Sequence, residues 1–217
     1  MVLLASVTYP HLQIEHVKGH HRRVGTLDDP ATARLGESLY AFLRRSIGGG
    51  LASAWQIERR RLLERRNDLW SPHNAMLRYA AAEAAIYAVL AFAFGPVAVA
   101  LFAGQSIIAI AILEAINYVE HYGLVRTQLP SGEYERVRPA HSWDSRNRAG
   151  NWLLINLPRH SDHHLVAAKR YQSLELVPDA PQLPGGYGAM FLLALVPPLW
   201  FRVMNPRVAA VRANASI

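Results

Sequence analysis

Residues 79–118 decide the fold, and they read YAAAEAAIYAVLAFAFGPVAVALFAGQSIIAIAILEAINY. These forty residues contain no Lys, Arg or Asp and only two Glu. A membrane-spanning helix needs about 20 apolar residues, and Gly95-Pro96 divides the run into two nearly equal parts. We therefore predict an all-α integral membrane protein in which residues 79–118 form a transmembrane hairpin. The alternative is a soluble helical hairpin, because Glu83 and Glu114 dilute the apolar run.

The segments on either side of the hairpin should face the same compartment, because two crossings return the chain to the side it left. Arginines cluster before and after the hairpin, at Arg59, Arg60, Arg61, Arg65 and Arg66 and at Arg126, Arg136, Arg138, Arg146 and Arg148. Loops rich in Arg and Lys stay in the cytoplasm. We predict one membrane domain, residues 1–217, made of a cytoplasmic helical region (1–78), the transmembrane hairpin (79–118) and a cytoplasmic C-terminal region (119–217).

The composition excludes several classes of protein. Hydrophobic residues make up 51% and charged residues 18%, so the chain is not intrinsically disordered. Because there is no Cys, disulfides, iron–sulfur clusters and thiol nucleophiles are excluded, and any metal must have nitrogen and oxygen ligands. The net charge of +7 suits nucleic acid or a lipid bilayer, but the basic residues flank a membrane hairpin and show no nucleic-acid-binding motif. We predict a bilayer and no nucleic acid as partner.

Two further stretches bear on the fold. Residues 189–201 are apolar but short and are interrupted by Pro197-Pro198, so we expect them to lie in the membrane interface or pack on the protein. Residues 1–9 read as the tail of an apolar helix without a cap. We therefore expect the chain to begin partway through a larger protein.

Histidines gather in three places that the predicted topology puts on one side of the membrane. His16 and His20 are one α-helical turn apart, with His21 beside them. A second group has the i, i+3, i+4 spacing that brings side chains to one helix face, and it consists of His160, His163 and His164. His121 lies where the second predicted membrane helix ends.

This clustering predicts bound metal. Zinc is the commonest metal at histidine sites, yet a closed site takes four ligands and a catalytic one about three. Seven imidazoles therefore indicate two metals, and two irons fit a membrane setting in which O₂ is activated. The other histidines, His11, His73 and His141, are expected to be structural or to support the site.

Five carboxylates lie near these histidines and could orient the imidazoles or bridge the irons, namely Glu15, Asp28, Asp29, Glu120 and Asp162. Capping and loop solvation are the alternative roles. Asp29-Pro30 in particular is typical of a turn followed by a helix start, with Pro at the first helical position.

The motifs resemble those of the membrane-bound alkane 1-monooxygenases. The resemblance begins with residues 15–24 (EHVKGHHRRV) and continues in order through residues 28–31 (DDPA), 34–40 (RLGESLY), 117–124 (NYVEHYGL), 141–143 (HSW), 159–164 (RHSDHH), 170–174 (RYQSL), 181–184 (PQLP), 186–187 (GY) and 197–200 (PPLW). It therefore covers essentially the whole chain. The NYVEHYG and RHSDHH elements are long and specific.

The resemblance implies a non-haem di-iron enzyme of the bacterial inner membrane, with its metal site facing the cytoplasm. Such an enzyme inserts one atom of O₂ into the terminal methyl group of a medium-chain n-alkane, and NADH supplies the electrons through rubredoxin reductase and rubredoxin. Carried over by position, the iron ligands are His16, His20, His21, His121, His160, His163 and His164. Asp29, Glu120 and Asp162 become candidates for supporting those ligands.

The family also has a further HExxH histidine box and several membrane helices upstream of the residues present here. Without them, two expected ligands are missing from this chain. The related alternatives are a membrane fatty-acyl desaturase and an aromatic-methyl hydroxylase, although the NYVEHYG element argues against a desaturase. A third alternative, from another class, is an inactive, truncated membrane protein that binds at most one metal.

Overall fold

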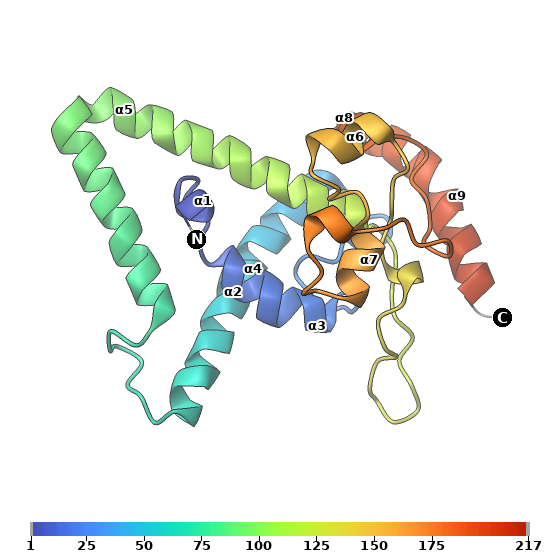
Figure 1. The fold of residues 1–217 in the computed structure, drawn as a ribbon, viewed down its shortest axis with the longest axis horizontal. Coiled ribbons are helices and arrows are strands. Elements are labelled where there is room, and N and C mark those ends of the chain that lie inside the picture. Colours follow the sequence, from blue (N-terminus) through green and yellow to red (C-terminus); the bar gives the residue numbers. More distant parts are fainter. Residues whose placement is uncertain (1, 216–217) are drawn as a thin grey trace. The chain divides into compact units, whose positions relative to one another are not determined.

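The computed structural model describes residues 2–215, which form helices and no strand, apart from two isolated β-bridges. In chain order the helices are α1 (Val2–Ala5), α2 (Leu12–Ile14), a π-helix (Glu15–His20), α3 (His21–Arg23), α4 (Leu39–Glu64), α5 (Ala75–His121), a 3₁₀-helix (Pro139–His141), α6 (Arg148–Leu153), α7 (His160–Leu165), a 3₁₀-helix (Tyr171–Ser173), α8 (Tyr187–Ala194) and α9 (Pro197–Ala215) (Figure 1). The all-α prediction is therefore confirmed for the described residues.

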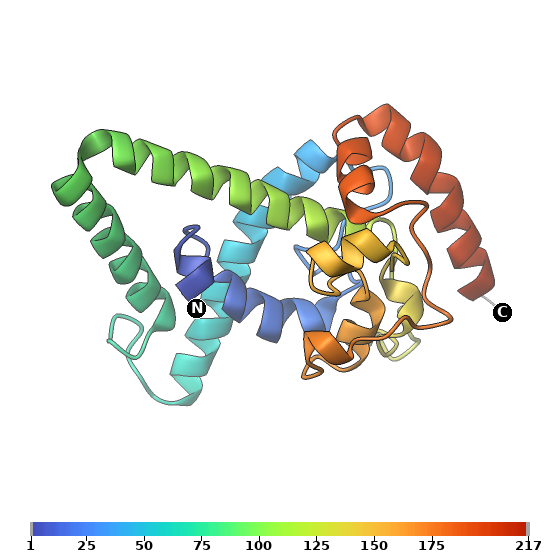
Figure 2. The ribbon, with the colours of Figure 1, turned by 45° about the horizontal axis from the view of Figure 1, so that its top comes forward.

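The helix α5 contains the predicted hairpin. Its backbone leaves the helical conformation at Gly95, where φ is 77° and ψ is −177°, and Pro96 begins the second arm. A positive φ suits glycine, and proline cannot donate the N–H that would continue the first arm. The two arms, residues 75–94 and 96–121, meet there at a sharp turn (Figures 1 and 2). The predicted break at Gly95-Pro96 is confirmed.

The surface of α5 is apolar and exposed. Its most apolar window has a mean hydropathy of 2.3 and none of that window is buried, so the helix passes a length and composition test for crossing a membrane. Phe92 is 96% exposed and Leu101 is 70% exposed. A soluble helical hairpin would bury such side chains against the protein.

The chain divides into two units, and both long helices α4 and α5 contribute to each. The first unit comprises residues 1–22 and 46–113, and the second comprises residues 23–45 and 114–217. In the first unit, a short segment after α1 lies between the two arms of α5. The Thr8 hydroxyl is 3.2 Å from the hydroxyl of Tyr87 and 3.0 Å from that of Ser106, so it links one arm to the other.

The second unit holds the larger hydrophobic core. Tyr118 and Tyr122 from the end of α5 pack against Trp200 of α9, with ring centres 5.1 and 5.2 Å apart. Phe42 of α4 and Trp143 complete the centre of this core, and both are fully buried. The core therefore fixes the end of α5, which carries His121.

The apolar stretch 189–201 is interrupted at Pro197-Pro198, as predicted: α8 ends at Ala194, and α9 begins at Pro197 and continues to Ala215 (Figure 2). Proline is favoured in the first turn of a helix, where its missing N–H has no intrahelical partner. The stretch packs on the protein, since Met190, Ala194 and Trp200 are buried in the core.

No helix starts at Pro30. Residues 30–38 form turns and α4 begins at Leu39. Asp29 accepts hydrogen bonds from the Ala31 backbone N–H and from the Thr32 hydroxyl, at 3.1 and 2.6 Å. These bonds close a local turn, because an Asp side chain offers the backbone an alternative to the helical hydrogen bonds.

Candidate metal centre

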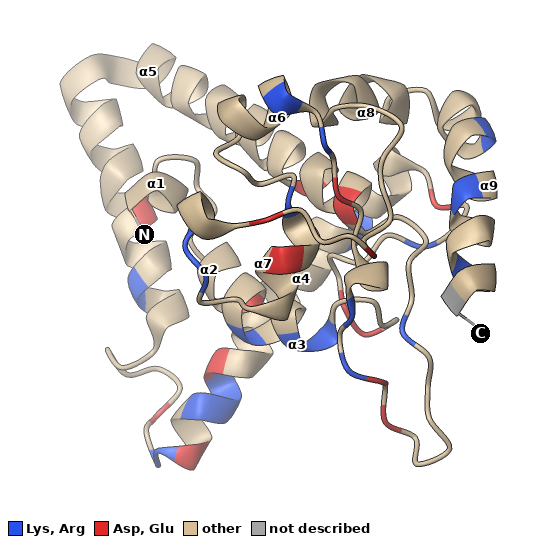
Figure 3. Cartoon of the chain, turned by 45° about the vertical axis from the view of Figure 1, so that its right-hand side comes forward, with Lys and Arg blue, Asp and Glu red and all other residues tan. Residues whose placement is uncertain are grey.

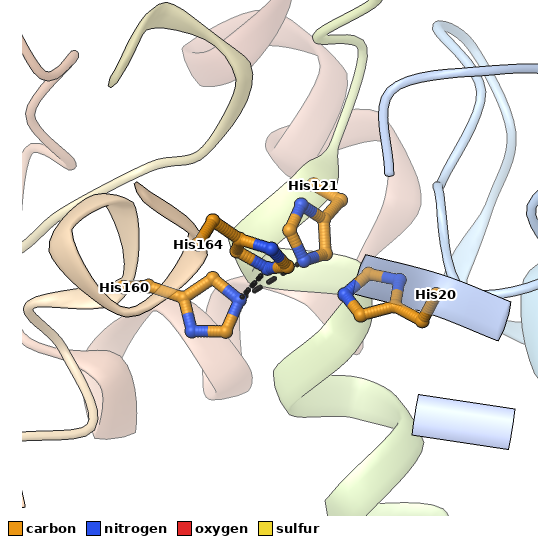
Figure 4. A group of neighbouring side chains, drawn as sticks. All are labelled: His20, His121, His160 and His164. Carbon is orange, nitrogen blue, oxygen red and sulfur yellow. Dashed lines mark hydrogen bonds between the residues drawn. The ribbon is translucent and has the colours of Figure 1, made fainter. Parts of the chain in front are cut away.

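Three histidine rings of the second unit converge on one point. His121 ends α5, and His160 and His164 lie one turn apart on α7. The Nε2 atom of His160 is 3.0 Å from Nε2 of His121 and 2.9 Å from Nε2 of His164, as Figure 4 shows. All three side chains are buried.

Hydrogen bonds alone account poorly for this arrangement. An Nε2 atom carries either one hydrogen or one lone pair in the ring plane, so His160 cannot make two good hydrogen bonds through it. One metal ion bound by the three lone pairs would satisfy them together. The residues present therefore fit a metal site.

The fourth histidine of this unit, His163, lies on the same helix. Its ring centre is 5.7 Å from that of His160 and 5.6 Å from that of His164. It is only half-buried. Within the second unit, His163 is therefore adjacent to the three converging rings.

Residues 143–144 connect the end of α5 to the start of α7. The backbone N–H of Trp143 donates to the carbonyl of Glu120 at 2.8 Å, and its indole N–H donates to the carbonyl of Tyr122 at 2.9 Å. The last carbonyls of a helix have no intrahelical partner, so Trp143 satisfies two of them. Trp143 therefore binds the backbone on both sides of His121, at Glu120 and at Tyr122.

The next residue, Asp144, caps the start of α7. Asp144 accepts a hydrogen bond from the backbone N–H of Ser161, at 2.8 Å, in the first turn of that helix. The neighbouring hydroxyl of Ser161 donates to the carbonyls of Pro139 and Ser142. Burial raises the pKa of the Asp144 carboxyl to about 6. One extended segment thus brings the helix end that carries His121 to the helix start that carries His160.

Sequence reasoning did not single out Trp143 as a capping residue, and it missed Asp144 and Ser161. Asp144 lies directly after the HSW motif, which was noted only for its resemblance. A cap supplied from 17 residues away has no fixed spacing that a motif search could recognise.

Glu120 lies beside the converging rings. Its Oε1 atom is 3.3 Å from Nδ1 of His160, and both side chains are buried. A carboxylate on the far nitrogen of a ligating imidazole fixes the ring orientation and leaves the other nitrogen for the metal. Glu120 lies on the Nδ1 side of His160, but the two atoms make no hydrogen bond in this structure.

The first unit holds the other histidine group, and its local structure differs from the expected one. Residues Glu15–His20 form a π-helix, in which backbone hydrogen bonds join residues five apart. His16 and His21 are therefore the pair whose Nε2 atoms meet, at 3.2 Å. The rings of His16 and His20 stack with centres 5.1 Å apart. The expected α-helical face for His16 and His20 is corrected to a π-turn, a feature that is frequent at functional sites.

Glu15 stabilises this turn from within. Its carboxylate accepts a hydrogen bond from the backbone N–H of His20 at 3.2 Å, and its side chain is buried. Gly50 of α4 faces this side chain, and a Cβ at that position would be 3.8 Å from Glu15 Cγ. The π-turn is thus fixed by a side chain that the sequence places directly before His16.

Two of the remaining carboxylates form other contacts. Asp162 accepts hydrogen bonds from Lys169 and from the backbone N–H of Glu175, both at 2.7 Å. It therefore ties α7 to the segment that follows. Asp29 closes the turn at Thr32 that is described above.

The three histidines outside these groups have structural surroundings. His141 accepts the backbone N–H of Arg138 at 3.0 Å, and burial lowers its pKa, which favours the neutral ring. His11 contacts the ring of Tyr9, and burial lowers its pKa as well. His73 is exposed, and its carbonyl accepts a hydrogen bond from Arg61 at 2.7 Å.

Comparison with known proteins agrees with this centre. The chain is 45% identical to alkane 1-monooxygenase 2 of Alcanivorax borkumensis, over 96% of this chain and 55% of that protein. It is 44% identical to alkane 1-monooxygenase 2 of Pseudomonas aeruginosa, over 98% of this chain and 56% of that protein. The xylene/toluene monooxygenase hydroxylase component of Pseudomonas putida is 30% identical, over 90% of this chain and 51% of that protein.

The chain thus spans about half the length of the relatives it matches. The model of the fatty acid desaturase family matches residues 1–202, which is nearly the whole chain. The chain belongs to the fatty acid desaturase family.

Proposed function

We propose that this chain is part of a membrane alkane hydroxylase, which uses O₂ to convert the terminal methyl group of medium-chain n-alkanes into a primary alcohol. The observation that carries the proposal is the convergence of the Nε2 atoms of His121, His160 and His164. Identity of more than 40% to two alkane 1-monooxygenases supports the choice of substrate.

The proposed ligands of two non-haem irons are His16, His20, His21, His121, His160, His163 and His164. The convergence of buried imidazole nitrogens supports a metal site, and an all-histidine donor set suits iron as well as zinc. When bound, iron supplies the O₂ chemistry and accepts electrons one at a time. The protein contributes neutral imidazoles and a buried Glu120 whose Oε1 atom lies 3.3 Å from Nδ1 of His160, where it could orient that ring.

We further propose that the two arms of α5 cross the bacterial inner membrane and that both arginine-rich flanks are cytoplasmic. The exposed apolar surface of α5 and the arginines on either side of it support this orientation. The proposed electron donors are rubredoxin and its NADH-dependent reductase. Their support is the similarity to alkane 1-monooxygenases, and O₂ and the n-alkane are the substrates.

The test uses the full-length protein in its own membranes and measures iron per chain together with alkane oxidation. His160→Ala should lose iron and hydroxylation, because its nitrogen is shared by two of the short contacts. His11→Ala is the matched control, since its ring contacts Tyr9 and belongs to neither histidine group, and it should keep its iron. Full iron content in the His160 variant would refute the ligand assignment.

An aromatic-methyl hydroxylase is the second candidate, favoured by the 30% identity to the xylene/toluene monooxygenase component. Supplying an n-alkane, xylene and an acyl lipid side by side separates the candidates by product. A primary alkanol supports the proposal, a benzylic alcohol supports the second candidate, and a desaturated acyl chain supports a desaturase. A chain with at most one iron and no product would be the inactive membrane protein.

A further inference from the structure

A cavity of 480 Å³ lies in the first unit beside the start of α5. Its walls come from three places in the sequence: the end of α2 with the π-helix, the second half of α4, and the first turns of α5. None of the histidines proposed as iron ligands lines it. It is therefore a separate feature of the fold.

The cavity is strongly cationic. Its lining includes Lys18, Arg61, Arg65 and Arg78, and the only carboxylate that lines it is Glu58. Figure 3 shows basic and acidic residues mixed at the end of α4, a basic residue near the start of α5, and little charge along the rest of α5.

The carboxylate of Glu58 is already used within the protein. Arg61 donates to its two oxygens at 2.7 and 2.6 Å, and the backbone N–H of Ala75 donates to it at 2.6 Å. The Asn74 side chain accepts the next backbone N–H of α5, from Met76. The first N–H groups of α5 are thus satisfied, so any attraction for an anion comes from the surrounding side chains.

Within residues 2–215, two cations of the lining have no acidic partner: Arg65 makes no side-chain hydrogen bond or ion pair, and Arg78 donates only to the carbonyl of Pro72, at 2.7 Å. The charge of Lys18 helps to lower the pKa of Glu58, but that carboxylate is already bound by Arg61. Like charges gathered around one cavity repel one another, and an anion bound among them relieves that repulsion. The cavity therefore has the charge of an anion site.

The surroundings indicate which anion. Trp70, in the loop before α5, is 74% exposed, and Tyr79 lines the cavity itself. Tryptophan and tyrosine gather where a membrane meets water. Beyond them, α5 presents exposed apolar side chains such as Val89 and Phe92, on which acyl chains can lie. A free phosphate or a nucleotide would leave that apolar surface unused.

We propose that this cavity binds the phosphate headgroup of an anionic phospholipid, with the acyl chains lying along the first arm of α5. Basic pockets at the cytoplasmic end of membrane helices are suited to such headgroups. The inference rests on the proposed membrane location of α5 but not on the alkane hydroxylase activity. The bound lipid would hold the loop between α4 and α5 at the membrane surface.

The test is native mass spectrometry of the whole chain in detergent with equal amounts of phosphatidylglycerol and phosphatidylcholine of the same acyl chains. We expect one phosphatidylglycerol to be retained in preference to phosphatidylcholine. Arg65→Gln/Arg78→Gln should weaken its binding about 25-fold, because each basic residue near a headgroup contributes about fivefold. Arg65→Gln alone should weaken it about fivefold and leaves the bond from Arg78 to Pro72 intact.

The matched control is Arg59→Gln/Arg60→Gln, which removes the same charge from exposed positions of α4 that do not line the cavity. It should leave phosphatidylglycerol binding unchanged. An equal loss in the control would mean general surface electrostatics and would overturn the proposal, as would equal retention of the two lipids. Inorganic phosphate that displaces the lipid at equal concentration would also overturn it, because the site would then not use the acyl chains.

The two proposals fail in different ways. Preferential retention of phosphatidylglycerol by a protein that oxidises no alkane would refute the proposed function and support the lipid site. Alkane oxidation by a protein that shows no lipid preference would support the proposed function and refute the lipid site.

Discussion

Gly123 follows the end of α5 and faces Val208 of α9, and replacing it tests how the structure positions His121. Its φ is +71°, and it follows α5 as a left-handed residue that ends the helix. A Cβ built on Gly123 would be 2.9 and 3.0 Å from the two methyl carbons of Val208. Its N–H also donates to the carbonyl of Ala33, and its carbonyl accepts from Arg212 at 2.7 Å.

Two costs add for Gly123→Ala. The left-handed conformation costs a non-glycine residue about 1–2 kcal/mol. The clash with Val208 is an overpacking of a buried contact, which costs about 1–3 kcal/mol. We expect the free energy of unfolding to fall by about 2–5 kcal/mol.

Denaturant unfolding in detergent, followed by near-UV circular dichroism of the buried tryptophans, measures this change. Gly132→Ala is the matched control, because Gly132 also has a positive φ, +85°, but nothing lies within 4 Å of the added Cβ. It should cost only the conformational part, about 1–2 kcal/mol. The difference between the two variants isolates the contact with Val208.

A second variant separates the clash from other effects. Gly123→Ala/Val208→Ala makes room for the new methyl group, so the double variant should be more stable than the sum of the single variants, by about 0.5–3 kcal/mol. Equal losses in Gly123→Ala and Gly132→Ala, or strict additivity in the double variant, would refute the close packing of α9 on Gly123.

Three further predictions concern the contacts at the ends of the helices. A hydrogen bond from Arg61 lowers the pKa of Glu58 below its usual value of 4.5, so the stability it gives is fully present above pH 4.5 and is lost as the pH falls through the lower, folded-state pKa. Glu58→Gln should cost about 1.5–3 kcal/mol at neutral pH in denaturant unfolding, and its difference from the parent should shrink in acid; a constant difference would contradict this. Trp143→Phe leaves a buried carbonyl of α5 without its indole donor and should cost about 1–3 kcal/mol, whereas Trp152→Phe, at an exposed position, should cost nothing measurable. Asp162→Asn should speed hydrogen exchange in the segment that carries Lys169 and leave the iron content intact; loss of iron without faster exchange would mean that Asp162 acts on an imidazole instead.

The sequence predicted the parts of the structure that depend on local pattern. The apolar run and its single Gly-Pro break predicted the two arms of α5, because length, hydropathy and a proline act on the chain where they occur. The RHSDHH spacing predicted one face of α7, since side chains at i and i+4 of an α-helix lie together. Glu120 was named because it precedes His121, and its carboxylate is 3.3 Å from His160.

The tertiary structure decided what depends on partners distant in the chain. The π-turn at residues 15–20 replaces the expected α-helical face, because a buried Glu15 accepts the N–H of His20. Trp143 and Asp144 cap two helices from one extended segment, and no spacing in the sequence predicts such long-range hydrogen bonds. Lys18 meets the arginines of α4 and α5 around one cavity only because the chain folds back on itself. A sequence pattern fixes the face of a helix on which a side chain lies, whereas the distance between two faces is fixed by the packing that joins them.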